Sequence, residues 1–276
     1  MRNGVYGVSA GLLSMLCCAF VSGTRTTSSV VTARAGPSVA FGSLEDDNKV
    51  QPATLTFGSL EADNKVKPST PATSSRTKVV MLGTGTPVPD PDRAGPGVAI
   101  VVDSVAYLFD AGAGVVRRAA AAGRDGIAAF APRTRGGQPS PRFDRVFISH
   151  LHSDHTLGLA DVIFTPWIQG RVAPLDVYGP PGIKRLVDGI LDGNAEDIAE
   201  RVASSGGPSA NGWKTVAHDV AEGEVFRDAR VTVTAFAVPH SGWKYAFGYR
   251  IQTPDRLIVL SGDAREIGRA SCRERV

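Results

Sequence analysis

The chain has 276 residues, of which 42% are hydrophobic and 21% charged, and its formal net charge of +3 is too small to indicate the concentrated basic face of a nucleic-acid binder. This length fits one domain of roughly 190 residues behind an N-terminal extension. The three cysteines, Cys17, Cys18 and Cys272, lie outside the segment expected to fold, so disulfides and thiolate metal ligands are excluded from holding that fold together.

The first 23 residues are expected to be absent from the mature protein. They begin with Arg2, continue as an apolar stretch and end in the small residues Val21-Ser22-Gly23, a pattern that predicts a secretory signal peptide over residues 1–23. The apolar run is interrupted and is short for the ~20 residues that span a bilayer, so a membrane anchor is the weaker interpretation. We therefore expect a secreted or extracytoplasmic protein with no membrane anchor in its mature form.

Residues 24–76 are expected to be a disordered linker with Pro-rich and Ser/Thr-rich flanks. They contain a short duplication, in which residues 41–50 and 57–66 are nearly identical, but two such copies cannot form a solenoid. The stretch before Glu45 contains no acidic residue and carries Arg25 and Arg34 among Ser and Thr. Delivery to an organelle by a signal followed by a transit sequence is therefore an open alternative.

From residue 77 onward, apolar runs with strand periodicity alternate with helical patterns. Strands are predicted at 78–82, 98–102, 106–109, 145–149, 175–178, 231–238, 245–251 and 257–261. Helices are predicted at 115–122, 157–167, 183–191 and 195–203, and the second of these is expected to end near Pro166. Strand-rich halves with helices between them imply an α/β sandwich over residues 77–265.

The strongest motif is the hexapeptide His150-Leu-His-Ser-Asp-His155, at the point where a strand-like run gives way to a helical pattern. It contains three of the five histidines, and a fourth, His240, follows the predicted strand 231–238. Neutral imidazole and carboxylate together suit zinc, or iron or manganese. His150 and His152 alternate like strand residues, whereas Asp154 and His155 lie past the turn, so two adjacent metal ions fit better than one.

This H-x-H-x-D-H arrangement closely resembles the signature of the metallo-β-lactamase-fold hydrolases, and the resemblance runs from about Lys78 to Arg265. The segment through Arg93-Ala-Gly-Pro96 is similar to the first loop of the ribonuclease Z and arylsulfatase-like branch. The resemblance implies an α/β fold of the metallo-β-lactamase type, an αββα sandwich that is incomplete here at its C-terminus.

The same resemblance implies a binuclear metal site with two zinc ions in the complete protein. His150, His152 and His240 would hold one ion, and Asp154, His155 and a last histidine beyond Asp263 would hold the other. Asp263 would bridge them at a position where some zinc β-lactamases need a cysteine thiolate, so antibiotic hydrolysis is not expected. Zinc lowers the pKa of bound water to ~7, which makes hydroxide available at neutral pH. Asp154 would be the catalytic residue that orients this nucleophile or shuttles its proton.

Four further side chains stand outside the ligand motif. Asp110 follows a strand-like run and is expected to hydrogen-bond the ligand loop rather than to act in catalysis. Trp167 and Trp243 are equally well interpreted as walls of a substrate pocket or as packing aromatics. His218 has no strand-end context like that of His240 and is expected on the surface.

The C-terminal residues do not continue the family pattern. The last histidine is expected some tens of residues after Asp263, and the sequence stops before that point. Residues 266–276 can be encoded by DNA that contains a common sequencing-adapter sequence, so they are expected to be an adapter artefact. The sequence is thus expected to be a fragment, truncated within the hydrolase domain.

Three functions compete. A ribonuclease Z-like phosphodiesterase is supported by Gly83-Thr-Gly-Thr-Pro87, Tyr178-Gly-Pro-Pro-Gly182 and Phe247-Gly-Tyr-Arg-Ile251, whereas an arylsulfatase-like or carboxylic ester hydrolase shares the same metal chemistry. The third is a non-catalytic fragment. Residues 183–230 contain six Lys or Arg against nine Asp or Glu, which is a poor clamp for RNA phosphates. Together with the predicted export, this balance favours a zinc-dependent hydrolase of a small-molecule ester over a nucleic-acid partner. No feature of the sequence indicates an oligomeric state.

Overall fold

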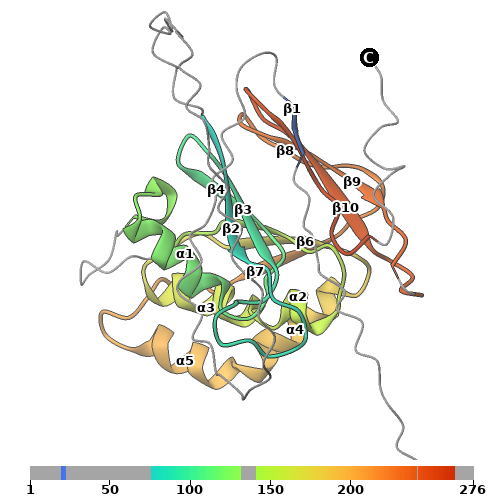
Figure 1. Ribbon diagram of the computed structural model, residues 1–276. Coiled ribbons are helices and arrows are strands. Elements are labelled where there is room, and N and C mark those ends of the chain that lie inside the picture. Colours follow the sequence, from blue (N-terminus) through green and yellow to red (C-terminus); the bar gives the residue numbers. More distant parts are fainter. Residues whose placement is uncertain (1–19, 23–75, 132–140, 241, 265–276) are drawn as a thin grey trace, which may run out of the picture. The chain divides into compact units, whose positions relative to one another are not determined.

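The structure is a computed structural model that describes residues 20–22, 76–131, 141–240 and 242–264. In these residues, two β-sheets pack face to face, and helices cover the outer face of the larger sheet (Figure 1). Each layer buries an apolar face against the next, which is how an α/β sandwich forms a stable core.

The larger sheet has six strands in the order β2-β3-β4-β5-β6-β7. They are β2 (Thr77–Gly83), β3 (Gly97–Val102), β4 (Val105–Phe109), β5 (Arg145–Phe147), β6 (Leu175–Gly179) and β7 (Thr215–Asp219). β2, β3 and β4 pair antiparallel, whereas β4 to β7 pair in parallel. Parallel strands present their carboxyl ends at one edge of the sheet, so the loops after β4, β5 and β6 meet there.

Strand β3 shows why this sheet needs continuous apolar runs, because all of its residues are buried. Ala99 and Val101 pack in the core with the helices, whereas Val98, Ile100 and Val102 pack in the core with the second sheet. Successive side chains of a strand point to opposite faces, so a strand that is covered on both sides must be apolar at every position.

The helical layer contains α1 (Val115–Arg124), α3 (Leu159–Ile168), α4 (Ile183–Gly193) and α5 (Ala195–Ala203), with the single turns η1 (Ala128–Phe130) and α2 (Ser153–Thr156) between them. Val115, Val162 and Ile183, from α1, α3 and α4, pack with Leu108 and Val146 of the sheet in one buried cluster. The ligand-bearing turn α2 lies between the sheet and α3 in the chain, directly before the start of the helix predicted over residues 157–167.

The smaller sheet has the order β1-β11-β10-β9-β8. Its strands are β1 (Phe20–Ser22), β8 (Gly223–Arg227), β9 (Thr232–Ala237), β10 (Phe247–Gln252) and β11 (Leu257–Leu260). β9 and β11 both pair antiparallel with β10, so they run in the same direction and end at the same edge. Between the sheets, the rings of Phe109 and Phe147 stack with centroids 4.9 Å apart, and Tyr249 packs against both.

Helix α3 continues through Pro166 to Ile168, one residue past the predicted end at residue 167. Proline lacks the backbone N–H that would bond the carbonyl of Val162, four residues earlier. The buried guanidinium of Arg171 donates to that carbonyl instead, at 3.0 Å, and to the carbonyl of Ile163 at 2.6 Å. A side chain from outside the helix thus satisfies the carbonyl that the proline leaves without its helical partner.

The predicted strands and helices are found with ends within two residues of those expected. β7 and β8 were not predicted, because Thr-Val-Ala-His-Asp and Gly-Glu-Val-Phe-Arg carry few apolar residues. Both strands lie at the edge of a sheet, where strands are commonly short and polar. Their existence depends on pairing with β6 and β9, which sequence periodicity does not reveal.

Several predicted segments fall outside the described residues. They are the linker up to residue 75, which includes the duplication, and the tail 266–276. Of the predicted signal peptide, only Phe20–Ser22 is described, as the strand β1 that pairs with β11. None of the helices in the described ranges is long and apolar enough to cross a membrane.

Candidate metal centre

Four strand ends bring the predicted ligands to one place. Asp110 directly follows β4, and His150 follows β5, the parallel neighbour of β4. In the other sheet, His240 follows β9 and Asp263 follows β11, two strands that run in the same direction. The structure thereby brings together all six predicted ligands, which are His150, His152, Asp154, His155, His240 and Asp263.

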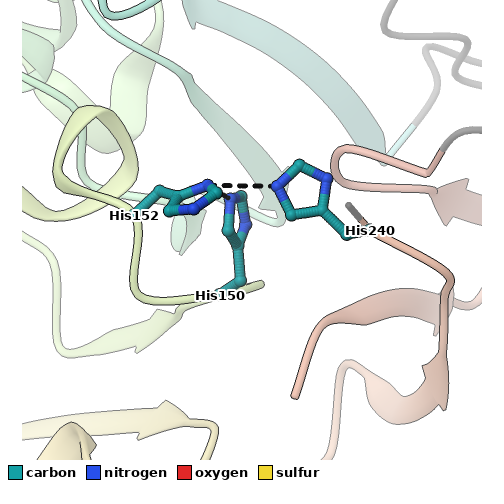
Figure 2. A group of neighbouring side chains, drawn as sticks. All are labelled: His150, His152 and His240. Atoms are coloured by element: carbon teal, nitrogen blue, oxygen red, sulfur yellow. Dashed lines mark hydrogen bonds between the residues drawn. The ribbon is translucent and has the colours of Figure 1, made fainter. Parts of the chain in front are cut away.

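The first group of donors consists of His150, His152 and His240. His150 Nε2 lies 2.9 Å from His152 Nδ1, and His240 Nε2 lies 3.0 Å from the same nitrogen. Figure 2 shows the three rings turned toward one another, two from the connection after β5 and one from the end of β9. His152 Nδ1 carries at most one proton, which cannot be directed at both Nε2 atoms, so a shared cation suits the three nitrogens better than hydrogen bonds do.

In His150 and His240, hydrogen bonds made by Nδ1 determine that Nε2 is the nitrogen that faces the first donor group. His240 Nδ1 donates to the backbone carbonyl of Asp263 at 2.9 Å. Ser149 Oγ has one proton, which it donates to Asp110 Oδ2 at 3.0 Å, so it accepts from His150 Nδ1, also at 3.0 Å. This network leaves a lone pair on Nε2 of both histidines, the form in which imidazole binds a metal.

The second group of donors consists of Asp154, His155 and Asp263. His155 is buried, and its Nδ1 lies 2.9 Å from Asp110 Oδ2. Its Nε2 is buried without a hydrogen-bond partner among the described residues. Asp263 Oδ1 at 3.3 Å and Asp154 Oδ2 at 3.6 Å are close to this nitrogen, but neither forms a hydrogen bond with it. Two carboxylates that face this nitrogen carry negative charge, which a cation bound between the three groups would balance.

The pKa values in the cluster point to the same requirement. Burial disfavours the charged form of His155, but the carboxylates of Asp110 and Asp263 outweigh it and raise the pKa of His155 to about 10. Burial and the charge on His155 lower the pKa of His150, so that ring is neutral at pH 7. Burial alone would raise the pKa of Asp263, yet the contact with His155 lowers it, and the carboxylate is ionised. A proton on His155 and a divalent cation beside it are alternative ways to balance these carboxylates.

Both groups fit a divalent ion such as zinc. Two ligands at about 2.0–2.1 Å from a tetrahedral ion lie ~3.3 Å apart. The nitrogen–nitrogen distances of 2.9 and 3.0 Å in the first group are close to this spacing. Asp263 lies between the groups, with Oδ1 3.3 Å from His155 Nε2 and Oδ2 3.9 Å from His150 Nε2. This position suits the predicted bridging role, while the identity and number of the ions stay predictions.

Asp110 holds the ligand loop in place, as predicted. Its Oδ1 accepts from the backbone N–H of Ser149 at 2.8 Å, and its Oδ2 faces both Ser149 Oγ and His155 Nδ1. Asp110 has a φ of 59°, in the left-handed region that few residues other than glycine adopt. Ser149 was not among the predicted site residues, and its place directly before His150 is the only signal of its role in the sequence.

The two candidate pocket tryptophans have different surroundings. Trp167 is fully buried and donates from Nε1 to the carbonyl of Ser209 at 2.7 Å, so it is a packing residue. Trp243 is 39% exposed, and the centroid of its ring lies 4.3 Å from that of His152. Only Trp243 therefore lies at the candidate metal centre.

His218 takes no part in either donor group. It lies on β7, where its Nε2 is 2.9 Å from Asp176 Oδ1 on the neighbouring strand β6. Its ring stacks on that of Tyr178 with centroids 4.4 Å apart. The expected surface location is correct in part, because the side chain is 37% exposed.

A cavity of about 60 Å³ opens beside the second donor group. Asp110, His155 and Asp263 line it on one side, and the loop Gly83-Thr-Gly85 and Tyr249 line it on others. This volume has room for a few water molecules. The glycine-containing loop after β2 thus borders a cavity that His155 and Asp263 of the second donor group also line.

The chain belongs to the β-lactamase superfamily, because the family model for the beta-lactamase superfamily domain matches residues 106–276, which include all six predicted ligands. The predicted α/β fold of the metallo-β-lactamase type is thereby confirmed. The resemblance to ribonuclease Z is confirmed by curated relatives. A ribonuclease Z of Mycobacterium bovis (strain BCG / Pasteur 1173P2) is 33% identical over 189 residues, which are 67% of this chain and 62% of the relative. A ribonuclease Z of Mycobacterium marinum is 34% identical over 189 residues, with the same two coverages.

The chain spans 62% of the length of these curated relatives. Among solved structures, the short form of human tRNase Z aligns with a TM-score of 0.47 and 22% identity, covering 67% of this chain and 68% of that one. A diphosphatase of the PhnP family aligns with a TM-score of 0.43 and 21% identity, covering 64% of this chain and 62% of that one.

Proposed function

We propose that this protein is a metal-dependent phosphodiesterase of the ribonuclease Z type and that its substrate is RNA. The observation that carries the proposal is the 33–34% identity to two mycobacterial ribonucleases Z over two thirds of the chain. This identity reverses the ranking of functions from the sequence analysis, in which a small-molecule ester hydrolase was favoured over a ribonuclease Z-like phosphodiesterase. Neither of these relatives is an arylsulfatase or a carboxylic ester hydrolase, so the ribonuclease Z alternative is the better supported of the two.

The six candidate ligands are assigned roles in this proposal. His150, His152 and His240 would hold one ion, Asp154 and His155 would hold the other, and the Asp263 carboxylate would serve both. Zinc, when bound, supplies Lewis acidity toward a phosphoryl oxygen and lowers the pKa of water. Iron or manganese could also bind here, since imidazole nitrogens and carboxylate oxygens are ligands for these metals as well.

Asp154 is the candidate for proton transfer. Its side chain is 9% exposed, and its Oδ2 lies 3.6 Å from His155 Nε2, at the border of the second donor group. A carboxylate in that place can orient an attacking water and accept its proton. Asp110 keeps the site oriented, because it holds the outer nitrogen of His155 and the backbone of Ser149 at once.

The acidic balance of residues 183–230 limits where RNA can be bound. This segment includes α4, α5, β7 and β8, and its net charge of −3 (six basic against nine acidic residues) would repel phosphates. An RNA substrate would therefore be held by residues close to the donor groups and not by this segment.

The test compares how fast the full chain, loaded with zinc, cleaves three types of bond. The substrates are a precursor transfer RNA with a 3′ extension, an aryl sulfate and an aryl carboxylic ester, and kcat/KM is measured for each. We expect cleavage of the RNA, and loss of that cleavage on chelation and in His152→Ala. His218→Ala is the matched control, because it removes a histidine from outside both donor groups and should keep the activity. Faster turnover of the sulfate or the carboxylic ester, with the RNA left intact, would overturn the proposal.

A further inference from the structure

An exposed turn follows the candidate ligand His240. The side chains of Trp243, Lys244 and Tyr245 are all exposed. The backbone N–H of Trp243 donates to the carbonyl of His240 at 2.7 Å, and Gly242 adopts a φ of 79°, which glycine does without strain. These contacts fix the turn beside the first donor group.

The indole of Trp243 contacts the donor group with only part of its surface. Its centroid lies 4.3 Å from that of His152, with the planes inclined at 60°, and 6.4 Å from that of His150. Trp167, by contrast, is fully buried. With 39% of its side chain exposed, Trp243 keeps an open aromatic surface directly next to the place where chemistry is expected.

Lys244 and Tyr245 add a cation and a second ring. Lys244 Nζ lies 4.8 Å from the centroid of the Tyr245 ring, and Tyr245 is 37% exposed. Proteins hold single-stranded nucleic acid with this combination, in which bases stack on aromatic side chains and cations meet the backbone phosphates. The turn has both parts, unlike the acidic segment 183–230.

We propose that Trp243 stacks against the nucleobase next to the scissile phosphodiester of RNA, while Lys244 meets a neighbouring backbone phosphate. This inference rests on the proposed phosphodiesterase function. Stacking on Trp243 requires only a planar ring beside the donor groups, and the aryl group of a small ester would also provide one. RNA fits better because it also brings a backbone phosphate to the position of Lys244, which a small neutral ester lacks.

The test measures binding of two non-cleavable oligoribonucleotides to the full chain loaded with zinc. One carries every base, and the other is abasic at the nucleotide next to the scissile linkage. Trp243→Ala should weaken binding of the base-bearing RNA by about 5- to 150-fold, the range for loss of one stacked base, and should weaken the abasic RNA much less. Trp243→Phe should keep most of the affinity. Val216→Ala, an exposed position on the edge strand β7, should change neither affinity.

Three results would overturn the inference. An unchanged ratio of the two affinities in Trp243→Ala would exclude stacking, even if the protein cleaves RNA as proposed. Loss of zinc from Trp243→Ala, with equal weakening for both RNAs, would mean that the indole only packs on His152. If the wild-type protein cleaves aryl esters and not RNA, the proposed function fails separately, and a raised KM for the aryl ester in Trp243→Ala would assign the stacking to an aryl group.

Discussion

His155 Nδ1 lies 2.9 Å from Asp110 Oδ2, and this contact determines which nitrogen of His155 faces the candidate metal centre. Because the carboxylate accepts from Nδ1, the buried Nε2 is left to face Asp263 and Asp154. A carboxylate behind a ligating imidazole fixes the ring and raises its basicity. Asp110 is therefore expected to act on a metal that it does not touch.

Asp110→Asn should lower the zinc affinity of the site by about 10- to 100-fold while the fold stays intact, because the amide keeps the shape but loses the charge behind His155. The affinity can be measured by competition with a chelator. Asp176→Asn is the control, since it makes the same change at a histidine–aspartate contact outside both donor groups, that with His218. Equal zinc affinity in Asp110→Asn and the wild-type protein would show that this carboxylate does not support the site.

Three segments of backbone meet at Gly112, beneath the ligand-bearing turn α2. A Cβ at this position would lie 2.4 Å from Gly95 C, 2.5 Å from Pro96 N and 2.6 Å from Asp154 O, all backbone atoms. Gly112→Ala should therefore destabilise the fold by about 1–3 kcal/mol or displace α2. Gly189 in α4 has nothing within 4 Å of such a Cβ, so Gly189→Ala should be neutral or stabilise by up to about 1 kcal/mol. Urea unfolding of both variants tests this difference, and equal midpoints for Gly112→Ala and Gly189→Ala would contradict the close packing at Gly112.

Four of the candidate ligands could be predicted because the hexapeptide keeps them within six residues, a local spacing that any fold preserves. The roles of His240 and Asp263 were predicted from the family resemblance. The contact of Trp243 with His152 and the bond from Arg171 to Val162 could not be predicted, since they depend on which strand and helix ends become neighbours. For the same reason β7 and β8 could not be predicted, because they are stabilised by pairing with neighbouring strands more than by their own composition. The small-molecule substrate was predicted from the net charge of residues 183–230 and from the predicted export, neither of which carries information on the side chains beside the donors.

Arg171 is fully buried and donates to four backbone carbonyls, those of Phe143, Val162, Ile163 and Gly212. Burial lowers the pKa of this guanidinium to about 10, which leaves it charged at pH 7. Arg171→Met should cost about 3 kcal/mol or more of unfolding free energy, because several buried carbonyls lose their donors. Arg201→Met removes a half-buried arginine that pairs with the solvent-accessible Asp197, and it should leave the urea midpoint nearly unchanged.

A double-mutant cycle tests whether Arg171 compensates for the backbone N–H that Pro166 lacks. Pro166→Ala restores the N–H that can bond the carbonyl of Val162, so Arg171→Met should cost less in the Pro166→Ala background. The cycle is read from urea unfolding of the four proteins. Strict additivity of the two changes would contradict the compensation between Pro166 and Arg171.

Asp228 should make stability depend on acid pH. Its carboxylate accepts from Tyr107 Oη at 2.6 Å and from the backbone N–H groups of Arg230 and Val231 at 2.7 and 2.9 Å. Burial raises the pKa of Asp228, but these hydrogen bonds outweigh it and hold the pKa below the usual 3.8. The folded pKa is therefore the lower one, so the stabilisation is complete above the unfolded-state pKa and is lost as pH falls through the folded pKa.

Asp228→Asn should accordingly be less stable than the wild-type protein at pH 7, and the difference should shrink as the pH falls below about 4. Unfolding free energies measured between pH 7 and pH 2 test this, with Asp192→Asn as the exposed control. A difference between Asp228→Asn and the wild-type protein that stays constant over this range would refute the role given to the carboxylate.

The most direct test of the two-ion site is anomalous X-ray diffraction at the zinc edge from crystals of the full chain grown with zinc. We expect one peak among His150, His152 and His240 and a second among Asp154, His155 and Asp263, with the Asp263 carboxylate between them. His152→Ala should remove or weaken the first peak. No anomalous peak at either donor group, or zinc bound only elsewhere on the protein, would contradict the assignment of these six residues as metal ligands.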